Sequence, residues 1–222
     1  MNTNKIDFKR PSVTVDILIF TIQDGTLKIV LVKRGVEPFK NTWAIPGGFV
    51  HLDESLEDAA RRELQEEAGL KNVYLEQLYT FGDPKRDPRE RVITVAYFAL
   101  IPSENINLKA ATDVVDAQWF PIGELPKLAF DHNQIIKYAL ERLENKIEYS
   151  NIAQALLPKK FRLSKLQKIY EIILGKKLDK RNFLKKILSL NLLESTGEKE
   201  LEGAHRPAML YKFKTKKIIF FD

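Results

Sequence analysis

The stretch that decides the fold is GGFVHLDESLEDAARRELQEEAGL, which runs from Gly47 to Leu70. Residues 55–67 have the spacing of a helix. At about 100° per residue its apolar side chains form one stripe, made of Leu56, Ala59, Ala60 and Leu64. Three glutamates, Glu63, Glu66 and Glu67, fall within this stripe or beside it. The pattern therefore points carboxylates toward the interior of the fold.

Like charges on a partly apolar face need a neutralising partner, because burying an unpaired carboxylate is costly. The three glutamates are three and four residues apart, so their side chains can converge. Such oxygen ligands suit Mg²⁺ or Mn²⁺ better than zinc, and these ions bridge to substrate phosphates. Gly47 could add a backbone carbonyl, and Arg62 can orient a neighbouring carboxylate. On spacing alone, a charged surface helix remains the alternative to a metal site.

The same stretch resembles the Nudix signature, G-x5-E-x7-R-E-U-x-E-E-x-G-U, in which U is a bulky aliphatic residue. Every specified position is filled: Gly48, Glu54, Arg62, Glu63, Leu64, Glu66, Glu67, Gly69 and Leu70. The resemblance implies a Nudix fold over residues 10–150 and hydrolysis of a nucleoside diphosphate linked to another group. It implies metal ligation by Glu63, Glu66, Glu67 and the Gly47 carbonyl. Glu54 and Arg62 would brace the loop and helix, and with Glu63 they form the expected catalytic set, whose general base stays unassigned.

The first part of the chain reads as an α+β unit, for which the resemblance implies an α/β/α sandwich. Alternating β-branched stretches predict strands at residues 12–22 and 27–34, joined by a hairpin turn at Asp24-Gly25. Further strands are expected at 72–81, 91–101 and 116–122, and a helix at 130–147. Pro158 marks a connector. We therefore divide the chain into a first domain (1–150), a linker (151–160) and a second domain (161–222).

Charge distinguishes the two domains. The net charge of the chain is +6, yet residues 158–222 alone hold 17 Lys and Arg against 7 Asp and Glu. A strongly basic domain favours nucleic acid as a partner, although a solvated lysine-rich surface gives the same count. Two helices, capped by Ser164 and Asp179, precede strands expected at 192–196 and 208–221. This order predicts a winged helix.

The second of these helices, residues 180–191, has a core-facing side and a polar side. The polar side carries side chains suited to phosphate and base-edge contacts in the major groove: Arg181, Asn182, Lys185 and Lys186. Arg206, at the tip of the predicted hairpin, extends the basic surface. We therefore predict a contact with double-stranded DNA, against the alternative of an ordinary amphipathic surface helix.

Two segments of the second domain, LDKRNFLKKILSLNLLEST and HRPAMLYKF, resemble the C-terminal winged helix of Nudix-related bacterial transcriptional regulators. Members of that group control NAD metabolism or arabinose use. With FGDPKRDPRERVITVAYFALI in the first domain, the likeness covers nearly the whole chain. It implies a homodimeric regulator on a palindromic operator, with ADP-ribose or a sugar as effector. Members that only sense often have a degraded Nudix box, whereas this box is complete.

The substrate contacts are the least constrained part of the sequence. Arg86 and Arg89 lie in a charged loop after Phe81, and either could bind a phosphate or ribose of the substrate. Phe81 could stack on its base. Exposed loops carry arginines for solubility as well, and an aromatic beside a strand is more often core. His51 and His132 are lone histidines, to which we assign no chemistry.

Several classes of protein are excluded or disfavoured. The chain has no cysteine, which excludes thiolate zinc sites and cysteine nucleophiles. It has no apolar run of membrane-spanning length and no signal-peptide pattern, so we expect a cytoplasmic protein without a membrane partner.

Two functions stay open: a regulator that binds and hydrolyses ADP-ribose or a related nucleotide, and a metabolic ADP-ribose pyrophosphatase with an accessory basic domain. Hydrolysis of RNA ends is less favoured, because the basic domain lacks an aromatic stacking surface.

Overall fold

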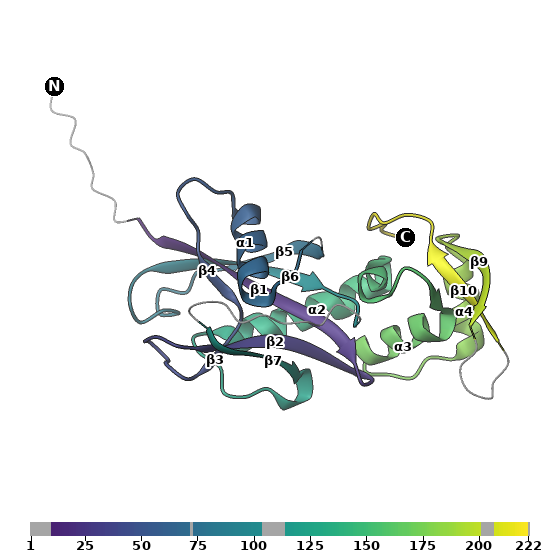
Figure 1. Cartoon of the computed structure of the whole chain (residues 1–222), viewed down its shortest axis with the longest axis horizontal. Helices are drawn as coiled ribbons and strands as arrows, with labels where there is room; N and C mark the ends of the chain where they lie inside the picture. Colours follow the sequence, from purple (N-terminus) through teal and green to yellow (C-terminus); the bar gives the residue numbers. More distant parts are fainter. Residues whose placement is uncertain (1–9, 72, 104–113, 201–206, 222) are drawn as a thin grey trace, which may run out of the picture.

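The computed structural model describes residues 10–71, 73–103, 114–200 and 207–221. The two predicted domains lie next to each other along the long axis, with the second at the right in Figure 1. A mixed sheet of order β3-β2-β1-β6-β5 forms the centre of the first domain, with β4 paired to β1 and β7 to β2. Its strands are β1 (Ser12–Gln23), β2 (Thr26–Arg34), β3 (Trp43–Ala44), β4 (Gly47–Phe49), β5 (Tyr74–Phe81), β6 (Val92–Leu100) and β7 (Val114–Pro121).

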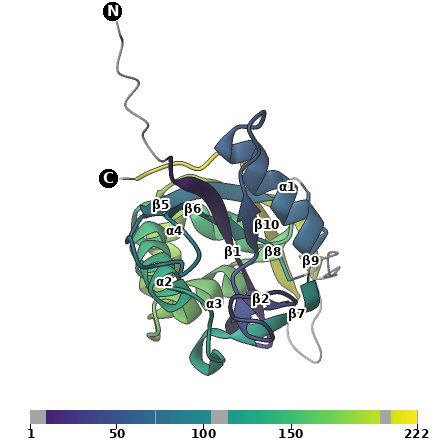
Figure 2. The same ribbon diagram turned by 90° about the vertical axis from the view of Figure 1, so that its left-hand side faces the viewer.

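Strand β1 separates two apolar layers because successive side chains of a strand point to opposite faces. Ile17 and Ile19 pack in one layer with Ala59 and Leu64 of helix α1 (Leu56–Ala68). The alternate residues of β1 face the other layer, which contains helix α2 (His132–Tyr149). Figure 2 shows the two helices on opposite sides of the sheet. The α/β/α sandwich is therefore confirmed.

Most predicted elements of this domain are present. Asp24 and Gly25 both have positive φ, 53° and 73°, as a two-residue hairpin turn of type I′ requires. The short strands β3 and β4 and the 3₁₀ helix η1 (Ile122–Glu124) were not predicted, because two or three residues are too few to carry a periodic pattern.

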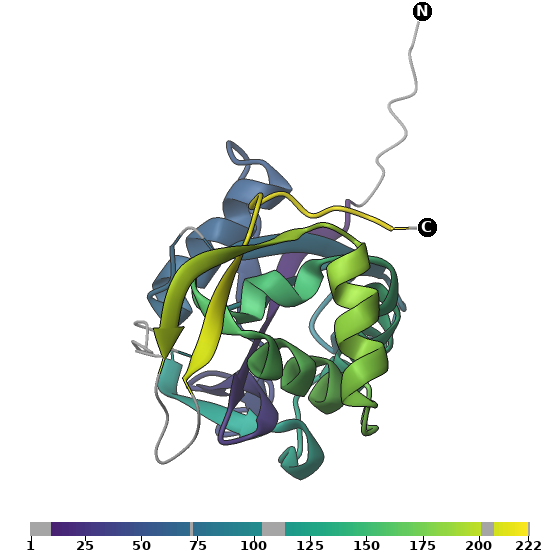
Figure 3. The ribbon, with the colours of Figure 1, turned by 90° about the vertical axis from the view of Figure 1, so that its right-hand side faces the viewer.

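The second domain has the winged-helix order of elements, and Figure 3 views it end-on. Its elements are β8 (Phe161–Arg162), α3 (Leu163–Ile173), α4 (Lys180–Ser189), β9 (Leu193–Glu200) and β10 (Ala208–Phe213), and the strands pair in the order β8-β10-β9. The prediction that Asp179 caps α4 is confirmed, since its carboxylate accepts the Asn182 N–H at 2.9 Å. The prediction for Ser164 is wrong: β8 leads directly into α3, so the helix has already begun at Leu163.

The segment predicted as a linker is packed into the molecule. It contains the 3₁₀ helix η2 (Ile152–Leu156), in which Ile152, Ala153 and Leu156 are buried. They belong to one hydrophobic core that includes Ile147 of α2 and Leu166 of α3. The two domains therefore share a continuous core.

The last predicted strand, 208–221, is shorter in the structure, because β10 ends at Phe213 and the tail turns back to the first domain. The Asn151 side chain donates to the Lys217 carbonyl at 3.1 Å and accepts the Ile219 N–H at 2.7 Å. The Phe221 N–H donates to the Tyr149 carbonyl at 2.9 Å. A chain reversal of this kind has no periodic signal in the sequence.

Candidate functional site

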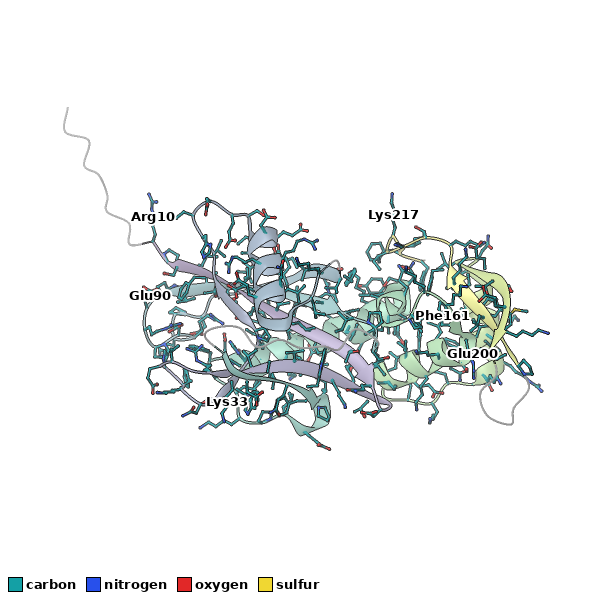
Figure 4. The ribbon with its side chains drawn as sticks, in the orientation of Figure 1. Arg10, Lys33, Glu90, Phe161, Glu200 and Lys217 are labelled. Carbon is teal, nitrogen blue, oxygen red and sulfur yellow. The ribbon has the colours of Figure 1, made fainter. Side chains whose placement is uncertain are left out.

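A cleft of about 390 Å³ opens at the end of the first domain that lies away from the winged helix. In Figure 4 Glu90 marks the side of the arginine loop and Glu200 the opposite end of the molecule. The cleft brings together most of the site residues predicted for this domain: Gly47, Arg62, Glu63, Glu66, Arg86 and Arg89. Segments from β4, α1 and the loop after β5 thus meet at one place, although they are far apart in the sequence.

Arg62 is the centre of the carboxylate cluster. Its guanidinium holds Glu54 through two hydrogen bonds of 3.0 and 2.7 Å, and it donates to Glu63 at 2.7 Å and to Glu66 at 3.3 Å. A further bond of 3.1 Å reaches the Phe49 carbonyl. A planar guanidinium presents its N–H groups in a fixed fork, which suits this geometry. Arg62 therefore ties the loop after β4 to helix α1.

Glu54 takes its position from Arg62 and from the backbone. Besides the guanidinium it accepts the His51 N–H at 2.8 Å. The hydrogen bonds from Arg62, followed by that of His51, lower the pKa of Glu54 to about 2. Glu54 is thus a permanently ionised brace at neutral pH.

Glu63 lies inward, with its side chain against the backbone of Gly48. A Cβ atom added to Gly48 would lie 2.1 Å from Glu63 Oε1, so only glycine leaves room for this carboxylate. Burial raises the pKa of Glu63, and the contact with Arg62 opposes that shift. Glu66 is exposed. Of the predicted apolar stripe only Leu56 is not buried, because it lies in the open first turn of α1.

The donors present in the cleft suit a hard divalent cation. Glu63 and Glu66 offer carboxylate oxygens and Gly47 lies in the same lining, a set that matches Mg²⁺ or Mn²⁺. The Glu67 side chain lies outside the described part of the chain. Among the side chains that are described, no group of three or more His, Asp or Glu residues is arranged to hold a metal ion.

The two predicted arginines have different environments. Arg86 is buried and binds Asp131 through two hydrogen bonds of 3.0 and 2.8 Å, with Asp16 at 3.3 Å. Arg89 is held by Asp87 at 3.0 and 2.7 Å, and 39% of its side chain is exposed. Arg86 is therefore engaged with protein carboxylates at the floor of the cleft, whereas Arg89 presents an accessible cation.

Phe81 is not brought to the cleft. Its ring packs against Tyr79 at 5.3 Å and Tyr138 at 5.9 Å, on the side of the sheet covered by α2. It is absent from the cleft lining. The structure therefore separates Phe81 from the other predicted substrate residues.

Asp16 and His132 belong to the cleft, although sequence reasoning gave neither a role. His132 Nδ1 accepts the Ile45 N–H at 2.9 Å, so the neutral ring carries its proton on Nε2, which faces Asp16 Oδ1 at 3.9 Å. Burial lowers the pKa of His132 and favours this neutral form. A lone histidine has no neighbours at a fixed spacing that would indicate a role. Asp16, in contrast, lies in the middle of the apolar strand SVTVDILIF, and a charged residue at such a position could have indicated a functional site.

The predicted DNA-binding side chains on α4 share one exposed face: Arg181, Asn182, Lys185 and Lys186. Phe183 and Ile187 on the other side of the helix are buried. In the part of the domain that the structure describes, the α4 cations form no ion pair, whereas Lys160, Arg162 and Lys212 each pair with a glutamate of β9. The exposed face of α4 therefore presents cations that no carboxylate of the described domain neutralises. Arg206 lies outside the described residues.

No described helix has the length and apolar character that crossing a membrane requires.

Two family models match the chain: the NUDIX domain over residues 11–143 and the NrtR DNA-binding winged helix domain over residues 153–213. A similar relative is the ADPR responsive transcriptional repressor NtrR of Acinetobacter baylyi, 41% identical over 94% of this chain and 84% of that protein. The ADP-ribose pyrophosphatase of Methanocaldococcus jannaschii is 42% identical over 59% of this chain and 73% of its own length.

Among solved structures, Shewanella oneidensis NrtR complexed with a 27mer DNA has a TM-score of 0.80 and 39% identity. The match covers 91% of this chain and 93% of that one. Both domains and their order are thus shared with a regulator that was crystallised on DNA. The Nudix half is also shared with hydrolases. The chain belongs to the Nudix family, in the group that joins a Nudix domain to an NrtR-type winged helix.

Proposed function

We propose that this protein is a transcriptional regulator that binds ADP-ribose or a related nucleoside diphosphate in the cleft and couples this to DNA binding. The observation that carries the proposal is the combination, within one continuous core, of the Arg62-braced cleft and the cationic face of α4. The similarity to an ADP-ribose responsive repressor and to a DNA-bound relative supports it.

In the proposed site the diphosphate lies on the carboxylate side of the cleft. Glu63, Glu66 and Glu67, with the Gly47 carbonyl, would hold Mg²⁺ or Mn²⁺. The cation would neutralise phosphate charge and lower the pKa of water for hydrolysis. Arg62, itself held by Glu54, keeps Glu63 and Glu66 in place. Because the complete box is retained, we propose that the protein hydrolyses its ligand as well as sensing it.

Helix α2 offers a physical route for coupling. It begins at His132, in the cleft lining, and ends at Tyr149, whose carbonyl binds the tail that follows β10. Coupling requires that the ligand favour one of two arrangements of this connection. We propose that the protein acts in the cytoplasm as a homodimer on a palindromic operator, with Arg206 adding to the contacts from α4.

A metabolic ADP-ribose pyrophosphatase is the second candidate. The observation that favours it is the pair of hydrogen bonds by which Arg62 holds Glu54. Binding of a ligand without hydrolysis does not require this brace of the catalytic carboxylates. In that case the basic domain would serve dimerisation or substrate access, and specific DNA binding would be absent.

A gel-shift experiment separates the two functions. Labelled DNA from upstream of the protein's own gene and from related promoters is titrated with protein at about 50 and 200 mM salt, against scrambled DNA of equal length. The regulator predicts a specific complex that Arg181→Ala with Lys185→Ala weakens. The same affinity for specific and scrambled DNA at both salt concentrations would rule out the regulator.

A further inference from the structure

The C-terminal tail, residues 214–221, lies outside both segments that match a known domain. The NUDIX match ends at residue 143, and the winged-helix match covers residues 153–213. Most of the stretch that the tail binds, residues 149–152, lies between the two matches. In Figure 1 the yellow tail leaves β10 and turns back toward the first domain. Neither matching domain therefore assigns a role to this contact.

Asn151 is the buried anchor of the tail, with 2% of its surface exposed. Its side-chain amide bonds to both Lys217 and Ile219, and its backbone N–H donates to the Ile219 carbonyl at 3.1 Å. The Gln154 side chain also donates to the Lys217 carbonyl, at 3.1 Å. Ile218 packs against the core that the two domains share. A buried amide that directs three hydrogen bonds to one segment holds that segment firmly.

The end of the tail lies on helix α2. The Phe220 ring stacks on Tyr149, with centroids 6.1 Å apart, and its centre is 5.1 Å from Lys146 Nζ. Lys146 is buried and binds Glu76 of β5 at 2.6 Å. The tail is therefore attached to a part of α2 that is itself fixed to the sheet of the first domain.

The tail gives the winged helix a second connection to α2. The first is the forward chain, which passes from α2 through η2 into β8. Strand β8 pairs with β10, and the tail after β10 returns to the end of α2. One connection leaves two packed bodies free to turn about it, whereas two connections resist that rotation.

We propose that residues 214–221 form a strap that transmits ligand binding from α2 to the winged helix and stays bound to α2 in both states. This strap rests on the proposed function, because it names the element that couples the two sites of that function. Helix α2 begins in the cleft lining at His132 and ends where the strap is anchored. A movement of α2 is then passed to β10 and α4 as one body instead of being absorbed at the junction.

The test measures a coupling ratio, the Kd for DNA with saturating ADP-ribose divided by the Kd without it, with Ca²⁺ in place of Mg²⁺. One variant ends after Lys214, so it keeps the bond of that residue to the Leu192 carbonyl. Lys216→Ala with Lys217→Ala is the matched control. It removes two exposed charges of the tail and leaves the carbonyls that anchor it. Lost charge changes both DNA affinities alike, so the ratio isolates the coupling.

A disulfide tests the strap in the full-length chain. Ser150 and Phe220 face each other in an antiparallel bridge. The flanking bonds make them a non-hydrogen-bonded pair, whose Cα atoms lie about 4.5 Å apart, within the reach of a disulfide. The chain has no cysteine. Ser150→Cys with Phe220→Cys, added to Asn151→Ala, therefore gives a weakened strap with one reducible link. Circular dichroism establishes folding, and this variant decides the test if the truncated chain does not fold.

We expect a ratio of at least about fivefold for wild type and the lysine control. The truncated chain and the reduced cysteine variant should fall below about twofold while both still bind ADP-ribose and DNA. Oxidation of the cysteine variant should restore the wild-type ratio. A full ratio in the truncated or reduced protein, or an uncoupled oxidised protein, overturns the strap. The wild-type ratio then still supports the proposed function, whereas a wild-type Kd for DNA that ADP-ribose leaves unchanged overturns both.

Discussion

Gly48→Ala tests the position of Glu63 most sharply. The added methyl group would lie 2.1 Å from Glu63 Oε1 and 2.7 Å from its Cδ, whereas an ordinary contact needs about 3.4 Å. The clash is with the end of a side chain, so we expect the fold to survive and the carboxylate to move by roughly 1 Å. That movement also breaks its 2.7 Å bond with Arg62. A displacement of this size costs about 100-fold in turnover, or about 2.7 kcal/mol of transition-state stabilisation.

The assay follows ADP-ribose hydrolysis with Mg²⁺, and Mn²⁺ affinity by calorimetry provides a second measurement. Gly123→Ala is the matched control, because a Cβ at that glycine has no neighbour within 4 Å. Circular dichroism and thermal unfolding establish that both variants fold. If Gly48→Ala kept both turnover and Mn²⁺ affinity at the level of Gly123→Ala, Glu63 would not belong to the metal site.

Three further results are expected. Asn151→Ala loses two hydrogen bonds to the tail at a buried position and should lower the free energy of urea unfolding by about 2–4 kcal/mol, whereas exposed Asn145→Ala should change it by less than about 0.5 kcal/mol. Glu54 has a folded pKa of about 2 against an ordinary value of 4.5, so its stabilising effect is complete above pH 4.5 and is lost as the pH falls toward 2. The difference in unfolding free energy between wild type and Glu54→Gln should therefore shrink over that window, and a constant difference would contradict the assignment. Glu66→Gln should strongly reduce metal-dependent hydrolysis and leave DNA affinity unchanged, which parallel hydrolysis and gel-shift assays measure.

The central helix and the buried position of Glu63 were predictable because they follow a helical period. Glu66, which the pattern placed beside the apolar stripe, is exposed. Ala59, Ala60 and Leu64 are buried and Arg62 binds Glu54 and Glu63, as the pattern and the resemblance indicated. Leu56 is exposed, because an angular pattern says which side a residue faces and not where the helix leaves the sheet. The amphipathic α4 was predictable for the same reason, since its buried and exposed faces alternate with the helical period.

The remaining features depend on contacts between segments far apart in the chain. Arg86 was expected to face a ligand, but it binds Asp131, which lies 45 residues further along the sequence. No local sequence pattern predicts an ion pair between residues so far apart. Phe81 lies just before the arginine loop in sequence, yet the direction of β5 carries its ring to α2. Phe130 has a positive φ, which its residue type does not favour. Contacts between residues far apart in the chain, and unusual backbone conformations, therefore could not be predicted from the sequence.

The most direct test of the regulator is the effect of ADP-ribose on DNA affinity. Fluorescently labelled genomic fragments selected by the protein are titrated by anisotropy with and without saturating ADP-ribose, with Ca²⁺ in place of Mg²⁺. We predict that ADP-ribose raises the Kd for DNA by at least about fivefold, the lower end of ordinary coupling, and that DNA raises the Kd for ADP-ribose by the same factor. Identical DNA affinities with and without bound ADP-ribose would contradict the proposal that this protein is an ADP-ribose responsive regulator.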